Sequence, residues 1–301
     1  RAMIRKIKKK TWRVYSEKPQ LLNLTTKETK MQFMDIRNGR FYLGDCLEVM
    51  KEIPDGVVDM LLVDLPYGTT ACSWDSIIPL DKLWEQYNRI CKENAAMVFT
   101  CSPPFTFVLA MSNIKKFKHE WIWNKVKPGA FAIAKYRPLR QHEDILVFCN
   151  GKLNYMPIMV PQKLRKGKIY ASSNSASVKY NDGKERTYDE KYPKTIIEFS
   201  NANNKDKIHP TQKPVELFEY LIKTYTNEGD LVLDNTAGSG TTAIAAENTG
   251  RKWVCIEQNE EYATKAVERI WNHEATPQEK SVSEVKIESD IPIPEGEENG
   301  N

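Results

Sequence analysis

The sequence has few residues of the kinds that bind structural metal ions. Only four of its 301 residues are histidine, and its six cysteines form no CxxC pair and do not cluster with the histidines. Structural zinc sites need such closely spaced ligands, and disulfide frameworks belong mainly to small secreted domains. The sequence therefore predicts no metal cofactor and reduced thiols, as in a cytoplasmic protein.

Long apolar runs are also missing. No stretch approaches the ~20 consecutive apolar residues that a membrane-spanning helix needs. The basic beginning of the chain is not followed by the apolar segment that a secretory signal requires. These absences favour a protein with no membrane partner.

Charge is distributed unevenly along the chain, although the net charge is only +4. Residues 151–213 carry 13 Lys/Arg against 6 Asp/Glu, whereas residues 273–301 carry 8 acids against 2 lysines. Seven Lys/Arg besides Arg1 also lie within residues 1–18. Such patterns are compatible with solvated faces and equally with a cationic surface for a polyanion.

Strand-like and helix-like segments alternate in two parts of the chain. Strand patterns cover 39–43, 57–64, 95–100, 120–125, 144–149, 231–234 and 252–257, and helical spacing covers 46–53, 80–92, 105–112, 215–226, 240–248 and 260–271. A hydrophobic content of 41% suffices for one large core. Repeated strand–helix units predict an α/β fold with a doubly wound, mostly parallel sheet.

This pattern divides the chain into five segments. A basic arm (1–35) precedes the first half of the α/β domain (36–149), and the second half follows at 208–272. Between the halves, residues 150–207 are polar, basic and poor in apolar runs, which predicts an inserted, loop-rich region. Residues 273–301 are expected to form an acidic, disordered tail.

A glycine-rich loop joins the strand ending at Asp234 to the next helix. Gly238 and Gly240 would let the backbone approach a ligand, and Glu257 at the end of the following strand could bind ribose hydroxyls. A nicotinamide site would need a third glycine, which is absent. The loop favours a nucleoside cofactor over an ordinary tight turn, and a nicotinamide dehydrogenase remains an alternative.

Asp64-Leu-Pro-Tyr67 follows the most hydrophobic strand pattern. In a doubly wound sheet, ligands bind at the carboxyl ends of the strands. An aromatic amine is a poor nucleophile, and two acceptors, the Asp64 carboxylate and the Leu65 carbonyl, could hold its N–H groups while Tyr67 stacks on its ring. The alternative is a helix cap and a proline turn, with Tyr67 in the core.

These two loops, in this order, resemble the amino-methylating DNA methyltransferases of the beta arrangement, over roughly residues 38–272. Four motifs carry the resemblance: Gly44-Asp45, Asp64–Tyr67, His209-Pro-Thr-Gln-Lys-Pro214, and Asp234–Gly240 followed by Glu257. His142-Glu143 is similar to a further family segment near the target base. The resemblance implies S-adenosylmethionine as cofactor and a target base that is flipped out of the duplex.

The resemblance also assigns roles to residues. Catalysis falls to Asp64, Leu65, Pro66 and Tyr67. Cofactor contacts fall to Asp45, Cys46, His209, Thr211, Lys213, Asp234, Ala237, Gly238, Ser239, Gly240, Thr241 and Glu257. The sequence departs from the family pattern at Leu65, which replaces a proline, and at Asn235-Thr236, which replaces Pro-Phe and removes an aromatic wall.

Adenine N6 is the predicted target because the catalytic motif begins with aspartate. Ser102-Pro-Pro-Phe105 resembles the corresponding motif of cytosine-N4 enzymes, but it follows the next strand and is interpreted as a helix start. Cytosine-N4 methylation is the nearest alternative. An RNA methyltransferase and a non-catalytic nucleic-acid-binding subunit are alternatives of other classes.

The insert is expected to read double-stranded DNA, as the variable region does in the family. Its candidate phosphate contacts are Lys163, Arg165, Lys166, Lys168 and Arg186. The resemblance further implies a homodimer and an enzyme acting near the nucleoid of a bacterium or a phage-infected cell.

Overall fold

The computed structural model describes residues 22–25, 30–68, 77–129, 131–168, 185–201 and 212–273. Its main sheet has ten strands in the order β1-β2-β3-β12-β11-β4-β5-β7-β6-β10. The strands are β1 (Leu22–Thr25), β2 (Lys30–Ile36), β3 (Gly39–Leu43), β4 (Val58–Asp64), β5 (Cys91–Cys101), β6 (Phe117–Gly129), β7 (Arg140–Phe148), β10 (Ile196–Glu198), β11 (Leu231–Asp234) and β12 (Lys252–Glu257).

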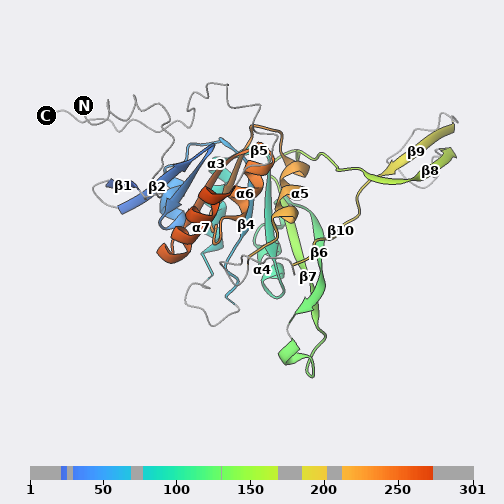
Figure 1. The fold of residues 1–301 in the computed structure, drawn as a ribbon, viewed down its shortest axis with the longest axis horizontal. Coiled ribbons are helices and arrows are strands. Elements are labelled where there is room, and N and C mark those ends of the chain that lie inside the picture. Colours follow the sequence, from blue (N-terminus) through green and yellow to red (C-terminus); the bar gives the residue numbers. More distant parts are fainter. Residues whose placement is uncertain are drawn as a thin grey trace.

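The middle of this sheet, from β3 to β5, is parallel throughout. Helices cover both of its faces: α2 (Cys46–Lys51), α3 (Leu80–Ile90) and α4 (Phe105–Ser112) pack on one, and α5 (Val215–Tyr225), α6 (Thr241–Asn248) and α7 (Glu260–Asn272) pack on the other (Figure 1). The doubly wound α/β sheet predicted from the sequence is therefore confirmed.

β4 shows why its sequence is a nearly continuous apolar run. Met60 and Leu62 face the core beneath α5 and α6, whereas Leu61 and Val63 face the core beneath α3. All four side chains are fully buried. A strand covered on both faces has no polar side, so its hydrophobic pattern does not alternate.

The predicted arm at 1–35 is wrong for its last part. β2 pairs antiparallel with β3 and brings Met34 and Ile36 into the core, and β1 pairs with β2. Only one face of β2 is buried, because Asp35 between these residues is exposed, so its sequence gives a weak apolar signal. The basic residues 1–18 and the acidic tail beyond residue 273 lie outside the described residues.

The predicted insert, residues 150–207, is only partly separate from the α/β domain. Met156 donates its backbone N–H to the carbonyl of Thr224 (2.8 Å), and β10 joins the main sheet beside β6. The separate part is the hairpin of β8 (Val160–Lys168) and β9 (Glu185–Lys191), which projects from the body (Figure 1). The insert is therefore anchored to the domain at both ends.

β6 and β7 form an antiparallel ribbon that is longer than the sequence predicts. It runs past the body of the sheet and ends in a loop with the short 3-10 helix η2 (Phe131–Ile133) (Figure 1). A second short 3-10 helix, η1 (Ile114–Lys116), precedes β6. No described helix is long and apolar enough to cross a membrane.

Candidate functional site

A cavity of about 510 Å³ opens at the carboxyl ends of β4, β11 and β12, where a doubly wound sheet places its ligands. All four predicted catalytic residues, Asp64 to Tyr67, line it. So do the following predicted cofactor-binding residues: Asp45, Cys46, Lys213, Asp234, Ala237, Gly238, Ser239, Thr241 and Glu257. His209 and Thr211 lie outside the described residues.

The glycine loop is tied to the neighbouring strand end through Glu257. The Gly238 N–H donates to Glu257 Oε2 (2.9 Å), and the Asn259 N–H donates to Oε1 (2.8 Å). Gly238 has φ +50°, a conformation that favours glycine. Burial raises the pKa of Glu257 above its usual range. The Gln258 N–H also faces this carboxylate, which leaves at least one lone pair to accept a ligand hydroxyl.

Gly240 has a packing role that the sequence did not predict. It does not line the cavity. Its φ is +72°, and a Cβ there would lie 2.8 Å from Cδ1 of Ile270 on α7. A side chain would not fit here because α6 begins directly against α7, and the predicted contact of Gly240 with the cofactor stays a prediction.

Asp234 is buried at the end of β11. It accepts hydrogen bonds from Thr242 Oγ1 (2.5 Å) and from the Thr236 N–H (3.1 Å). Burial raises its pKa to about 7, and these hydrogen bonds only partly offset the desolvation. A cationic group nearby would favour the ionised carboxylate.

Asn235 was regarded in the sequence only as a departure from the family pattern. Its Oδ1 accepts from the Tyr87 hydroxyl (2.8 Å), while its Nδ2 is buried without a hydrogen-bond partner. Because Asn235 lines the cavity, this amide is a donor available to a ligand. Nearby, Asp45 caps α2 by accepting from the Leu47 and Glu48 N–H groups (2.8 and 3.1 Å).

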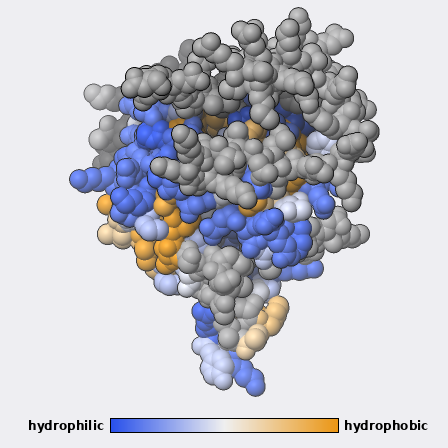
Figure 2. Space-filling model, turned by 90° about the vertical axis from the view of Figure 1, so that its left-hand side faces the viewer, coloured by the Kyte–Doolittle hydropathy of each residue, from blue (hydrophilic) through white to orange (hydrophobic). Residues whose placement is uncertain are grey.

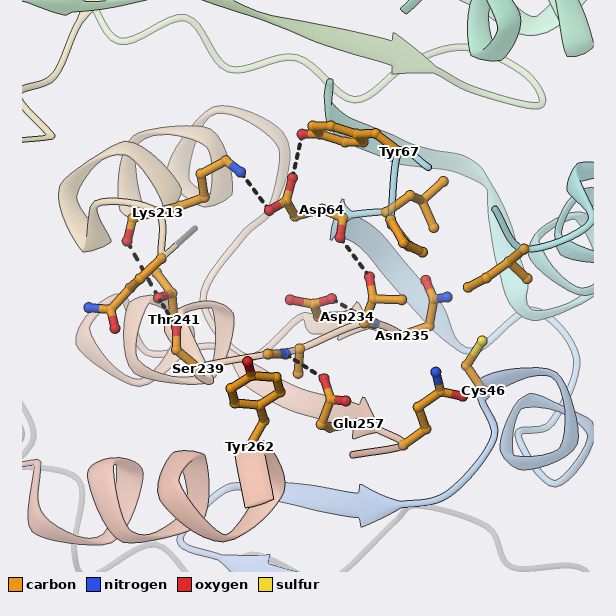
Figure 3. Close-up of a pocket in the computed structure, with 18 of the residues that line it drawn as sticks. Cys46, Asp64, Tyr67, Lys213, Asp234, Asn235, Ser239, Thr241, Glu257 and Tyr262 are labelled. Atoms are coloured by element: carbon orange, nitrogen blue, oxygen red, sulfur yellow. Dashed lines mark hydrogen bonds and ion pairs between the residues drawn. The ribbon is translucent and has the colours of Figure 1, made fainter. Parts of the chain in front are cut away.

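The other end of the cavity is built around Asp64 (Figure 3). Its Oδ1 accepts from the Tyr67 hydroxyl and from Thr100 Oγ1, both at 2.6 Å, and its Oδ2 binds Lys213 Nζ at 2.5 Å. Burial raises the pKa of Tyr67 well above its ordinary value, so its hydroxyl stays a donor. Two hydroxyls fill the lone pairs of Oδ1, and Oδ2 keeps one.

Lys213 also faces a second carboxylate. Its Nζ lies 3.6 Å from Glu143 Oε2, which has no hydrogen bond, and Lys125 binds Glu143 Oε1 at 3.1 Å. Burial alone would lower the pKa of Lys213, but Asp64 and Glu143 together raise it, which keeps the ammonium charged. Four alternating charges therefore connect β4, β7 and β6.

Tyr67 has one ring face covered by Phe105. The ring centroids are 5.4 Å apart and the planes make an angle of 24°. Ser102 is held by Arg140, which also donates to the carbonyl of Pro103 (3.1 Å). Ser102–Phe105 thus begins α4 and supports Tyr67, and none of its residues lines the cavity.

Thr236 connects the two ends of the cavity. Its Oγ1 donates to the backbone carbonyl of Asp64 (3.0 Å), so the glycine loop holds the Asp64–Tyr67 loop directly. Sequence analysis missed Thr100, Lys125 and Thr236 because each acts through a partner far away in the sequence. His142-Glu143 gave a weak signal for Glu143.

The predicted DNA contacts lie on the hairpin. Lys163, Arg165 and Lys166 are exposed on β8, and none of the described residues of the hairpin lines the cavity. Lys168 and Arg186 lie in the paired strands, opposite Glu185 and Gly167 respectively. The structure therefore does not bring these residues to the cavity.

Comparison with known proteins identifies relatives over most of the chain. Residues 58–268 match the family model described as DNA methylase, of the N6/N4 type. The chain is 28% identical over 246 residues to the DNA adenine methyltransferase YhdJ of Escherichia coli K12, which covers 75% of this chain and 81% of YhdJ.

Solved structures share the fold. The crystal structure of the M1.HpyAVI–SAM complex matches with a TM-score of 0.53 and 26% identity, covering 77% of this chain and 99% of that one. The cytosine-N4-specific PvuII DNA methyltransferase matches with a TM-score of 0.57 and 18% identity, over 82% and 90% of the two chains. The fold therefore does not by itself distinguish the target base, since it occurs in a cytosine-N4-specific enzyme.

Proposed function

This chain belongs to the N6/N4 DNA methylase family and is a DNA methyltransferase, and we propose that it methylates N6 of adenine, using S-adenosylmethionine. The observation that carries the proposal is the Asp64–Tyr67 loop, whose carboxylate lies across one cavity from the glycine loop. Adenine is supported by the aspartate that begins this loop and by the likeness to an adenine methyltransferase.

The cavity fits this cofactor chemically. Asp45, Asp64, Asp234 and Glu257 give it a predominantly acidic wall, which suits a sulfonium ion and an ammonium group. Glu257 would accept ribose hydroxyls, and the unpaired Asn235 amide would donate to an acceptor. When bound, the cofactor supplies an already activated methyl group.

Asp64 Oδ2 is the oxygen that would accept the adenine N6–H. Oδ1 already accepts two hydroxyl hydrogen bonds, whereas Oδ2 binds only Lys213. The Leu65 carbonyl is the second acceptor. With both N–H groups held, the nitrogen lone pair is directed out of the ring plane toward the methyl group.

Lys213 would then move toward Glu143. Glu143 Oε2 lies 3.6 Å from its Nζ and has no hydrogen bond, so this oxygen can take over the ammonium. The exchange keeps the buried lysine paired while Asp64 binds the amine. Because Lys213 stays charged, Asp64 Oδ2 is the group positioned to receive the proton released after methyl transfer.

Tyr67 would stack on the flipped base. Phe105 covers one face of its ring and the residue lines the cavity, which leaves the other face for the base. The β8–β9 hairpin would bind phosphates through Lys163, Arg165 and Lys166, away from the target base. The homodimer implied by the resemblance stays a prediction that sedimentation analysis tests.

Product identification tests the proposal. The protein would be incubated with methyl-labelled S-adenosylmethionine and mixed-sequence duplex DNA, and the DNA then digested to nucleosides. Label in N6-methyladenine is the expected result. Label in N4-methylcytosine would overturn the base assignment, and label in RNA but not DNA would overturn the substrate.

A further inference from the structure

The end of the β6–β7 ribbon, residues 125–140, stands beside the mouth of the cavity. β4 is parallel to β5, and both β5 and β6 are antiparallel to β7, so β6 runs parallel to β4. The carboxyl end of β6 therefore lies at the same sheet edge as Asp64. Lys125 and Glu143, at the base of this segment, line the cavity.

From there the segment extends beyond the body. The ribbon continues past the sheet to the pair Gly129 and Arg140 (Figure 1). Figure 2, turned about the vertical axis, shows a narrow projection at the same lower end, with hydrophilic and hydrophobic atoms side by side. We call residues 125–140 the finger.

The finger is charged with one sign only. It contains Lys125, Lys127, Lys135, Arg137 and Arg140 and no acid. Lys125 and Arg140 have partners at its base, in Glu143 and in Ser102 and Pro103. Lys127, Lys135 and Arg137 are exposed, and no carboxylate among the described residues pairs with them. Three cations are therefore available for phosphates.

Two aromatic side chains are exposed on the same segment. Phe131 is 67% exposed and Tyr136 is 87% exposed. Such exposure contributes nothing to the core, whereas aromatic rings beside cations are the combination that binds unstacked bases. The β8–β9 hairpin differs, because acids such as Asp189 and Glu190 accompany its cations.

The backbone at the base of the finger is strained. Val126 has φ +67°, which a β-branched residue rarely adopts. Asn124 Oδ1 holds this conformation by accepting from the Val126 N–H and from Gln141 Nε2, both at 3.0 Å. A conformation that costs free energy and is held by side chains sets the direction in which the finger leaves the sheet.

We propose that the finger contacts duplex DNA beside the target base, with Phe131 and Tyr136 stacking where the flipped base leaves the helix. Lys127, Lys135 and Arg137 bind the flanking phosphates. The proposal rests on DNA as the substrate and is independent of which base is methylated. Its physical basis is that extruding a base requires unstacking, which the two rings offset.

The aromatic pair is tested first, on a site mapped by product analysis. Phe131→Ala/Tyr136→Ala should lower single-turnover methylation about 10- to 100-fold, the scale of lost base stacking. Cofactor affinity should be unchanged. The defect should shrink when the target base faces an abasic position, because the base is then unpaired and its extrusion costs less free energy.

A matched control lies on α4, away from both proposed DNA-binding projections. Phe107 and Met111 are 64% and 69% exposed, so Phe107→Ala/Met111→Ala also removes exposed apolar area. This variant should methylate DNA like the parent protein. A finger variant that methylates normally, or whose defect is the same on the abasic duplex, would overturn the stacking role.

The cations are tested through salt dependence. Lys127→Ala/Lys135→Ala/Arg137→Ala should flatten the slope of log K against log salt by up to about 3, roughly 0.9 per phosphate contact. An unchanged slope would remove the finger from the interface. If the parent protein methylates no DNA but the finger variant has a flatter slope, the proposed function is wrong and the finger still contacts DNA. If the parent methylates DNA and the variant keeps the parent's slope, the proposed function holds and the finger proposal is wrong.

Discussion

The two ends of the cavity handle charge in opposite ways. At the glycine-loop end, Asp45, Asp234 and Glu257 line the wall, and no described lysine or arginine forms an ion pair with them. At the other end, Asp64 and Glu143 alternate with Lys213 and Lys125. The first end is therefore suited to a cation from outside, whereas the second would have to release an internal cation before the proposed base could bind.

This difference determines how favourable the carboxylates at each end are when no ligand is bound. Asp234 is a buried acid with a pKa raised to about 7, so the unliganded protein holds an unfavourable carboxylate there. Asp64 is instead stabilised by three donors. A cationic ligand should stabilise the carboxylates of the first end, and a ligand at the second end should displace Lys213 from Asp64. Substitutions at the two ends should therefore have separate effects.

The largest effect is expected for Asp64→Asn. It removes the acceptor at Oδ2 but keeps the shape of the side chain, so methyl transfer should fall at least about 100- to 1,000-fold. Cofactor affinity, measured by calorimetry, should stay within a few-fold because the glycine loop is untouched. Near-normal single-turnover rates would refute the catalytic assignment.

Gly238→Val should abolish cofactor binding. The side chain would enter the loop that lines the cavity and adopt φ +50°, which valine disfavours. Gly229→Val is the matched control, because Gly229 has φ +83° with open space around it and lies outside the cavity wall. Both should lower thermal stability, and equal cofactor affinity in the two variants would contradict the prediction.

Glu143→Gln should slow catalysis without weakening cofactor binding. Lys213 would lose the second carboxylate, so releasing Asp64 would leave a buried ammonium without an anionic partner. We expect kcat to fall about 10- to 100-fold, on the scale of one lost charged hydrogen bond. Glu268→Gln, at an exposed position of α7, is a control of the same chemistry. A change confined to cofactor affinity would contradict the assignment of Glu143 to the Asp64 end of the cavity.

The smallest effect is a pH dependence from Asp234. Its pKa is raised from 3.8 to about 7, so the folded protein holds the proton more tightly than the unfolded chain. Without ligand, the free energy of unfolding should fall as pH rises through this window, and remain constant above it. A cationic ligand binds the ionised form, so its affinity should rise up to about pH 7.

Calorimetric titrations from pH 5.5 to 8.5 would measure this rise, which is at most about tenfold per pH unit below the pKa. Asp234→Asn should flatten the profile, since the amide cannot ionise. A profile that keeps its slope in this variant would move the titrating group elsewhere, with Glu257 the next carboxylate to replace.

Local motifs were predictable because their residues are adjacent in the chain. Asp64–Tyr67 and Asp234–Gly240 each follow a buried strand, so strand ends and glycine spacing indicate a shared cavity. The fold was predictable for the same reason, because β3, β11 and β12 coincide with the apolar strand patterns of the sequence. β2 was not predicted because only one of its faces is buried, which gives a weak apolar pattern.

Contacts between distant residues were not predictable. Lys213 and Asp64 are 149 positions apart, and Thr236 meets the Asp64 carbonyl across 172 positions. Glycine spacing likewise did not show that Gly240 serves the packing of α6 on α7. Nothing in the finger's sequence shows that it stands at the cavity while the more prominent basic cluster of the insert does not.

The sequence by itself determined the layered α/β fold, the order of the two loops and the type of chemistry, because periodic burial and short motifs are local properties. Only the tertiary structure decided which oxygen of Asp64 is available, which carboxylate can take over Lys213 and which projection stands beside the cavity. Those choices depend on parallel strands that bring their carboxyl ends to one edge of the sheet, whatever their separation along the chain.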